Sequence, residues 1–234
     1  MNKFILAFIM FFITTSASLA DSNVYITQSG AALDLDITID GNANAVGAAN
    51  DRTLLTGANL DVDIDLIGAT NTITGDFIGA GNSGSDDLKI NQTGSTNTTA
   101  LNVGASAATD DVRIIENRVG SSGETTYTIG SAATVQDVTV TVDVVGDDID
   151  IALIENSSSS GSDKTTDIDI GTDSDDVDIV VTHTGAGAHK TKLLCTGACG
   201  TSDFTFSQTG ANSTDVDLVV TNAAGSDVDI IITD

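Results

Sequence analysis

Leu60-Asp61-Val62-Asp63-Ile64-Asp65-Leu66 is the stretch of sequence that decides the fold. Apolar and acidic residues alternate along it, so an extended strand places Leu, Val and Ile on one face and Asp on the other. One face is therefore buried and the other is hydrated. Because an isolated strand cannot bury its apolar face, the rest of the chain must supply similar strands as neighbours.

Similar strands recur about every 26 residues. A pattern of Asp, apolar, polar and apolar residues starts at Asp34, Asp61, Asp87, Asp111, Asp137, Asp167 and Asp215, and a second series starts at Asp148, Asp176, Asp203 and Asp227. The turn glycines Gly68, Gly94, Gly120 and Gly146 follow one another at intervals of 26 residues. The sequence therefore predicts an all-β fold, a β-solenoid of about eight two-stranded rungs. An antiparallel sandwich is the alternative, but a fixed period favours the solenoid.

The composition excludes several classes of protein. The chain has 234 residues, with 8 Lys and Arg against 34 Asp and Glu and a formal net charge of -26, so a nucleic-acid binder is not expected. An apolar fraction of 40% is too high for a disordered acidic chain. The complete lack of Pro agrees with continuous strand pairing. Scarce aromatic and His residues argue against an enzyme on this scaffold, and no cofactor is expected.

Residues 1–20 have the features of a secretory signal peptide. Lys3 gives a positive start, the run from Phe4 to Ile13 is apolar but too short to span a bilayer, and Ser18-Leu19-Ala20 offers small residues before a cut. The solenoid domain is then 21–234, with no transmembrane segment. The expected location is secreted, extracellular or at the cell surface.

One turn motif points to a known family. Gln92, Gly94 and Asn97 give the turn Gln-x-Gly-x-x-Asn, and partial copies occur at Gln28 with Gly30 and at Gln208 with Gly210 and Asn212. This motif resembles the curlin repeat of curli, the extracellular amyloid fibres of bacterial biofilms. The resemblance implies a β-solenoid whose subunits stack end to end, with an outer-membrane secretion pore and a nucleating subunit as further partners. The chain departs from the family where turns such as that at Gly146 lack Gln, and where no polar export extension follows Ala20.

Stacked rungs would align outward Asp side chains. If the strands start in register, Asp34, Asp61, Asp87, Asp111, Asp137, Asp167 and Asp215 form one column of self-repelling carboxylates. The next outward column would then read Asp36, Asp63, Lys89, Arg113, Thr139, Asp169, Lys192 and Asp217. In it, we expect ion pairs of Asp63 with Lys89 and of Lys192 with Asp169 and Asp217, each of low energy at an exposed site.

Acidic clusters and two cysteines are the remaining candidates for chemistry. Three clusters are candidate Ca²⁺ ligands, although a solvated acidic face explains them as well: Asp110-Asp111, Asp147-Asp148-Asp150 and Asp173-Asp175-Asp176-Asp178. Cys195 and Cys199 flank one turn of an exported chain, which predicts a local disulfide. The alternative, a metal held by these cysteines with His183 and His189, would have Lys190 and Lys192 nearby to oppose a cation.

The functional hypothesis is an exported structural subunit that self-assembles into curli-like fibres for the biofilm matrix and adhesion. Its partner is then a second copy, which pairs with the unsatisfied backbone groups of the terminal rungs, here Val24 to Gln28 and Val228 to Thr233. The alternative is a monomeric acidic solenoid that binds Ca²⁺ or a surface as an adhesin. Ice binding would require a repeated outward column of Thr, whereas Thr139 and Thr141 look scattered.

Overall fold

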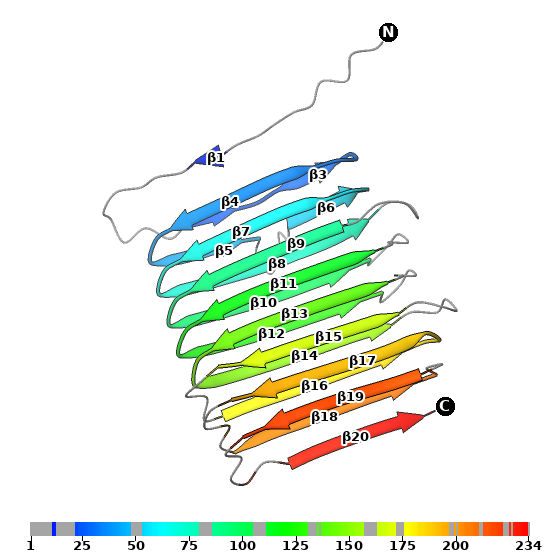
Figure 1. Cartoon of the computed structure of the whole chain (residues 1–234). Coiled ribbons are helices and arrows are strands. Elements are labelled where there is room, and N and C mark those ends of the chain that lie inside the picture. Colours follow the sequence, from blue (N-terminus) through cyan, green and yellow to red (C-terminus); the bar gives the residue numbers. More distant parts are fainter. Residues whose placement is uncertain are drawn as a thin grey trace.

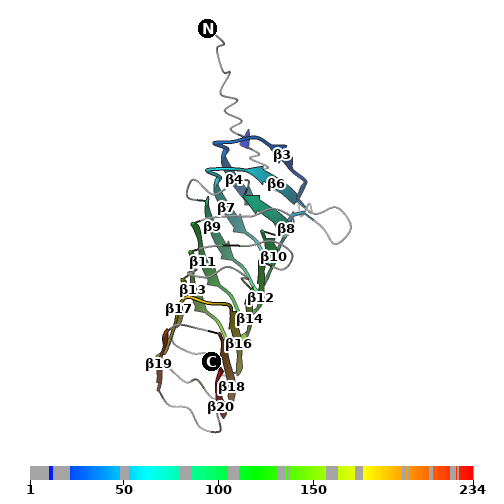
Figure 2. The ribbon, with the colours of Figure 1, turned by 90° about the vertical axis from the view of Figure 1, so that its right-hand side faces the viewer.

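The computed structural model places the chain in two long parallel sheets that face each other (Figures 1 and 2). The expected signal peptide at 1–20 lies outside the described residues except for Phe11 and Phe12. The described residues are 11–12, 22–47, 53–79, 86–104, 111–130, 135, 137–156, 163–171, 176–196, 199, 201–210, 213–221, 225 and 227–233.

Strands alternate between the two sheets along the sequence. In order, sheet A contains β1 (Phe11–Phe12), β4 (Asp34–Asp40), β7 (Asp61–Ile67), β9 (Asp86–Thr93), β11 (Val112–Val119), β13 (Val138–Val145), β15 (Lys164–Ile170), β17 (Ala188–Cys195) and β19 (Ser213–Val220). Sheet B contains β2 (Ser22–Val24), β5 (Ala43–Val46), β8 (Thr70–Gly79), β10 (Thr96–Val103), β12 (Ser122–Ile129), β14 (Asp148–Asn156), β16 (Asp176–Thr184), β18 (Ser202–Thr209) and β20 (Asp227–Thr233), and the short strands β3 (Thr27–Ser29) and β6 (Thr53–Gly57) extend it.

This arrangement is a β-solenoid, so the predicted fold class and the spacing near 26 residues are confirmed. Neighbouring strands pair in parallel with partners such as Asp61 and Asp87 in sheet A or Thr96 and Ser122 in sheet B. Six consecutive pairs, from β7 with β8 to β17 with β18, form regular turns of the described chain. The sequence predicted about eight, which is more than these six; the terminal pairs, β4 with the divided β5 and β6, and β19 with β20, lie outside the regular turns.

The core is a narrow layer between the sheets. In β7, Val62, Ile64 and Leu66 are buried, while Asp63 and Asp65 lie on the outer face, as the alternation predicts. The corner from sheet A to sheet B is too tight for side chains. A Cβ on Gly68, Gly94, Gly120 or Gly146 would collide with the carbonyl oxygen of the glycine one turn earlier. The glycine period therefore follows from backbone stacking.

Candidate functional site

The outer face of sheet A carries only part of the expected Asp column. The strand register stacks Asp34, Asp61 and Asp87, and then continues through Arg113, Thr139, Thr165, Lys190 and Asp215. The prediction of seven stacked carboxylates is therefore wrong. Arg113 makes two hydrogen bonds to Asp87, from Nε to Oδ1 at 2.9 Å and from Nη2 to Oδ2 at 2.8 Å. A cation thus ends the stack where a fourth Asp was expected.

Asp111, Asp137 and Asp167 leave that column because each lies two residues away from the column position, which Arg113, Thr139 and Thr165 occupy. An even shift keeps a side chain on the same face of a strand but moves it along the strand. Asp111 and Asp137 precede β11 and β13 with φ of 50° and 47°. The Oδ1 of Asp137 accepts a hydrogen bond from the backbone N of Asp163 at 3.2 Å. Asp137 therefore stabilises a corner between the sheets.

The second outward column also differs from the prediction. It reads Asp36, Asp63, Lys89, Ile115, Thr141, Asp167, Lys192 and Asp217. Arg113, Thr139 and Asp169 therefore lie in other columns. The Nζ of Lys192 donates to Asp167 at 3.0 Å and not to Asp169, because the register places Asp167 beside it. Asp63 does neighbour Lys89 in the register.

A longer carboxylate column lies on the outer face of sheet B. Glu124, Asp150, Asp178, Asp203 and Asp227 are paired in succession on five neighbouring strands. The pKa of Asp150 is raised by partial burial and then by the charges of Asp178, Asp148, Glu124 and Asp176. The sequence analysis missed this column, although its second Asp series included two of the members.

The candidate Ca²⁺ clusters are only partly described. Asp110, Asp173 and Asp175 lie outside the described residues. Asp147 and Asp148 follow the corner after Gly146, and Asp150 belongs to the column on sheet B. Among the residues that the structure describes, no group of three His, Cys, Asp or Glu side chains is arranged to hold a metal ion.

The turn at Gln92, Gly94 and Asn97 belongs to a buried amide ladder. Asn44 donates from Nδ2 to Asn71 Oδ1 at 2.9 Å, and Asn71 donates in the same way to Asn97 at 2.9 Å. Each amide also bonds a backbone carbonyl at the corner, as Asn71 does to Thr93 at 3.1 Å. The Nε2 of Gln92 donates to the carbonyl of Thr98 at 3.3 Å. These side chains fix the corner from sheet A to sheet B.

The two partial copies of the motif lie at the opposite corner. Gln28 in β3 pairs with Leu55, and Gln208 in β18 is buried and donates to Thr191 Oγ1 at 3.1 Å. Gly30 and Gly210 follow these strands where the chain passes from sheet B to sheet A. Asn212 lies outside the described residues. The turns at Gln28 and Gln208 therefore do not stack on the turn at Gln92 to form one ladder.

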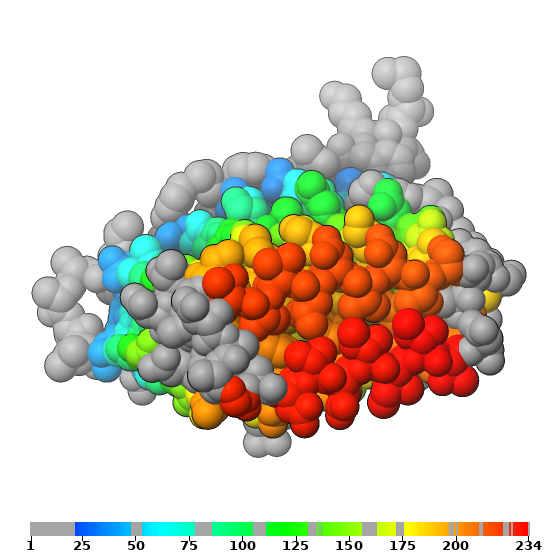
Figure 3. Space-filling model, turned by 60° about the horizontal axis from the view of Figure 1, so that its bottom comes forward, coloured from blue at the N-terminus to red at the C-terminus, as the bar shows by residue number. Residues whose placement is uncertain are grey.

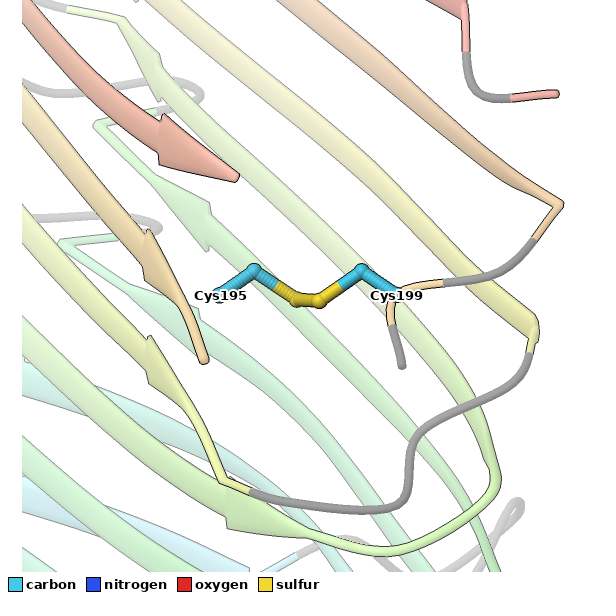
Figure 4. Close-up of a disulfide and its surroundings, with 2 residues drawn as sticks. All are labelled: Cys195 and Cys199. Atoms are coloured by element: carbon cyan, nitrogen blue, oxygen red, sulfur yellow. A yellow bond between two sulfur atoms is a disulfide. The ribbon is translucent and has the colours of Figure 1, made fainter. Parts of the chain in front are cut away.

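Cys195 and Cys199 form a disulfide at the end of β17 (Figure 4). Both side chains are buried, and the bond closes the corner from sheet A to sheet B that the amide ladder closes in earlier turns. The sequence had left open a metal site made of these cysteines with His183 and His189. With the two thiols bonded to each other, neither is available as a thiolate ligand.

A cluster of ionisable side chains is buried at the opposite corner, from sheet B to sheet A. His183 and His189 pack edge to face with ring centroids 5.4 Å apart. His183 Nε2 lies 3.5 Å from Glu155 Oε2 and 3.0 Å from Thr166 Oγ1. Within the described residues, several polar atoms of the cluster have no hydrogen-bond partner, namely Glu155 Oε2, Lys164 Nζ, His183 Nδ1 and both ring nitrogens of His189.

Burial pushes each of these groups toward its neutral form. It raises the pKa of Glu155 to about 8, against the opposing charge of Lys164. It lowers the pKa of His183 to about 3, helped by His189 and Lys164. The pKa values of Lys164 and His189 are also lowered by burial. Sequence reasoning noticed the histidines but not that Glu155 and Lys164 join them.

At the C-terminal end of the described chain, β19 and β20 each have one edge that no other described strand covers. Figure 3 looks toward this end, where β19 (orange) and β20 (red) are the last strands described. The inner face of β20 continues the core columns of Phe204 and Phe206, but Val228, Ile230 and Ile232 are 40%, 48% and 52% exposed. Apolar side chains that should be buried therefore face solvent.

The N-terminal end is built differently. In sheet B, β2 and β3 cover β5 and β6, and Val24 and Ile26 pack against the core. In sheet A, the described strand that covers the outer edge of β4 is β1, which belongs to the expected signal peptide. The predicted terminal rungs, Val24 to Gln28 and Val228 to Thr233, thus both lie in sheet B.

Comparison with known proteins gives no relative: no protein-family model, no curated protein and no solved structure matches the chain. The resemblance to the curlin repeat therefore remains an interpretation of the turn motif. Helices that are long and apolar enough to cross a membrane are absent from the described part of the chain.

Proposed function

We propose that this protein is an exported structural subunit that assembles end to end into curli-like extracellular fibres of a biofilm matrix. The observation that carries the proposal is the open C-terminal end, where β20 exposes Val228, Ile230 and Ile232. A solenoid that remains monomeric needs a polar terminal cap. An uncapped strand instead offers its free N–H and C=O groups to another chain.

The two ends of sheet A fit each other as successive layers. The inner residues of β19 are Val216, Leu218 and Val220, which pack against the core from one side only. The inner residues of β4 are Leu35, Ile37 and Ile39. A second copy that places its β4 on β19 would continue three apolar columns across the junction, at the usual strand spacing of about 4.8 Å.

Charge opposes this junction and so regulates it. The continued columns bring Asp215 over Asp34 and Asp217 over Asp36 of the next copy. Inside sheet A a cation ends the stack of Asp34, Asp61 and Asp87, as Arg113 does beside Asp87. Repulsion between exposed carboxylates is weakened by salt and removed by protonation. We therefore expect faster assembly at higher ionic strength or lower pH.

The experiment is time-resolved electron microscopy of residues 21–234 at low and high salt, with thioflavin fluorescence and fibre diffraction of the same samples. Two variants test whether the inner face of β20 forms the junction. Ile230→Lys places a charge on the inner face of β20 and should abolish fibres. Ile231→Lys is the matched control, because Ile231 is 52% exposed beside it but lies on the outer face. Ile231→Lys should assemble as the parent chain does.

The proposal would be supported by fibres with a cross-β spacing of about 4.8 Å that form from the parent chain and from Ile231→Lys but not from Ile230→Lys. Equal effects of the two variants would mean that the inner face of β20 is not the junction. A persistent monomer under all conditions would contradict assembly. It would favour the second candidate, a monomeric acidic adhesin that uses the carboxylate column from Glu124 to Asp227 on sheet B.

A further inference from the structure

The two sheets have unequal numbers of layers at the N-terminal end of the 21–234 chain. In sheet B, the layer of β2 and β3 lies beyond β5 and β6. In sheet A, β4 is the last strand once β1 is removed with the expected signal peptide. At the C-terminal end, the last described turn has one strand in each sheet, β19 in sheet A and β20 in sheet B. Among the described strands of 21–234, sheet B therefore has one layer for which sheet A has no counterpart.

This inequality prevents both sheets from closing at once in an end-to-end junction. If β19 pairs with β4 of the next copy, β20 must lie directly on β5 and β6 of that copy, because consecutive strands of a solenoid alternate between the sheets. β2 and β3 already occupy this position. If β20 instead pairs with β2 and β3, a gap one strand wide separates β19 from β4. That gap would leave the buried Leu35, Ile37 and Ile39 of β4 without cover.

We propose that residues 22–29 are a removable cap, and that β20 of the preceding subunit displaces them when the fibre grows. This inference rests on the proposed end-to-end assembly and names the event that completes its junction. The cap and the incoming β20 compete for the same sheet edge, which β5 and β6 form. The incoming strand belongs to a second copy of this chain.

The register shows that β20 fits this edge better than the cap does. Val24 aligns with Val46, and Gln28 aligns with Leu55. Following the columns through the solenoid, Val228 and Ile232 belong to the same two positions. The exchange therefore replaces Gln28 with Ile232 next to Leu55 and Phe77, and burial of Ile in place of Gln is favourable there.

β20 also forms a more continuous strand than the cap does, which favours the exchange. β2 and β3 are strands of 3 residues each with Tyr25 and Ile26 between them, whereas β20 is one strand of 7 residues. The cap is held by bonds such as Gly47 N to the carbonyl of Val24 and Leu54 N to the carbonyl of Ile26, each 2.8 Å long. An incoming strand supplies equivalent carbonyl groups. The backbone bonds of the edge are thus exchanged and not lost.

Cleavage by chymotrypsin after Tyr25 tests where the cap goes. Tyr25 is 50% exposed, and the other described aromatic residues of 21–234, Phe77, Tyr127, Phe204 and Phe206, are buried. If the cap is displaced, Tyr25 leaves the sheet, and it should be cut several-fold faster in fibres than in monomer. If β20 instead stacks on the cap, the backbone around Tyr25 is paired on both edges in the fibre and its cleavage should be lost. The second result would overturn the proposal.

Two substitutions in the cap provide a kinetic test of the intact chain. Gln28→Ile adds an apolar contact with Leu55, so it should hold the cap more firmly and lengthen the lag before assembly several-fold. Thr27→Ile is the matched control, because Thr27 lies on the outer face of the same strand. It should leave the lag nearly unchanged. An unchanged lag for Gln28→Ile would count against displacement of the cap.

Failure of this inference can be separated from failure of the proposed function. If no form of 21–234 assembles, end-to-end assembly itself is wrong. If fibres form but Tyr25 is protected in them, assembly stands and the cap stays in place.

Discussion

The two buried polar corners of the solenoid follow opposite principles. At the corner from sheet A to sheet B, the same side chain recurs on three turns, as Asn44, Asn71 and Asn97. The amide nitrogen of each donates to a backbone carbonyl, and those of Asn44 and Asn71 also donate to the next Asn. At the other corner, Glu155 and His183 bring different ionisable groups together and leave buried atoms without partners.

Repetition explains the difference. A primary amide is both donor and acceptor, so an amide between two identical amides has both groups satisfied; in the described chain the exception is Asn44 Oδ1, at the end of the ladder. The ladder ends where the repetition ends. Gly123 follows Asn97 in the same column, and its missing side chain leaves room for the guanidinium of Arg118. Solenoid corners thus tolerate buried polarity when every turn offers the same group.

The largest effect that we predict is the loss of the ladder at Asn71. Asn71→Ala removes the acceptor of Asn44 and the donor to Asn97 and to the carbonyl of Thr93, and leaves these groups buried. We expect the free energy of unfolding to fall by about 3 kcal/mol. Urea denaturation of the monomer at low ionic strength would measure it.

Asn102→Ala is the control for this prediction. Asn102 also bonds across turns, to Asp76 at 2.8 Å, but it lies on the outer face where water can replace the lost bond. We expect a loss of under about 0.5 kcal/mol. Equal losses at Asn71 and Asn102 would show that burial does not distinguish the two amides.

The fold was predictable because its signals are periodic. The alternation in β7 and the glycines at intervals of 26 fix the strands, the faces and one corner. The register was harder to predict, since Asp111 and Asp167 preserve the alternation and are displaced by two residues along the strand. Only the pairing of whole strands shows that Arg113, and not Asp111, lies beside Asp87.

The candidate site was predictable only in part. The terminal strands were identified from their apolar residues, but the sequence does not show that both belong to sheet B. The cluster around His183 was also hidden, because Glu155 and Lys164 lie on either side of a serine-rich stretch of the sequence. Long connections carry no periodic signal, so residues on either side of them are hard to align.

The disulfide provides a smaller effect at the corner that the amide ladder also closes. Cys195 and Cys199 are separated by 4 positions, and closing so short a loop is expected to stabilise the fold by about 2 kcal/mol. Denaturation with and without reductant would measure this difference. The double variant Cys195→Ala/Cys199→Ala should match the reduced chain and show no response to reductant. A response in that variant would place the effect elsewhere.

An effect at neutral pH smaller than that of the disulfide is expected at the ionisable corner. His183→Leu removes a ring whose Nδ1 has no partner, and Thr166 Oγ1 keeps its bond to Glu155 Oε1 at 3.3 Å. We expect the free energy of unfolding to change by under about 1 kcal/mol, in contrast to Asn71→Ala. A loss as large as that at Asn71 would remove the distinction between the two corners.

The pH dependence separates the contributions of His183 and Glu155. Because the pKa of His183 falls from 6.5 to about 3 on folding, the unfolded chain gains a proton first, and stability is lost as the pH falls through this range. Because the pKa of Glu155 rises from 4.5 to about 8, the folded chain keeps a proton longer, and stability is lost as the pH rises through that range.

The two pH dependences offset each other between about pH 4.5 and 6.5. We therefore expect His183→Leu to remove the loss of stability in acid, and Glu155→Gln to remove the loss in alkali. Carboxylates on the outer faces, such as Asp150, titrate alike in all three chains, so the differences between urea curves measured across pH isolate the corner. Parallel curves for the parent chain and His183→Leu below pH 6 would show that His183 is not held neutral by burial.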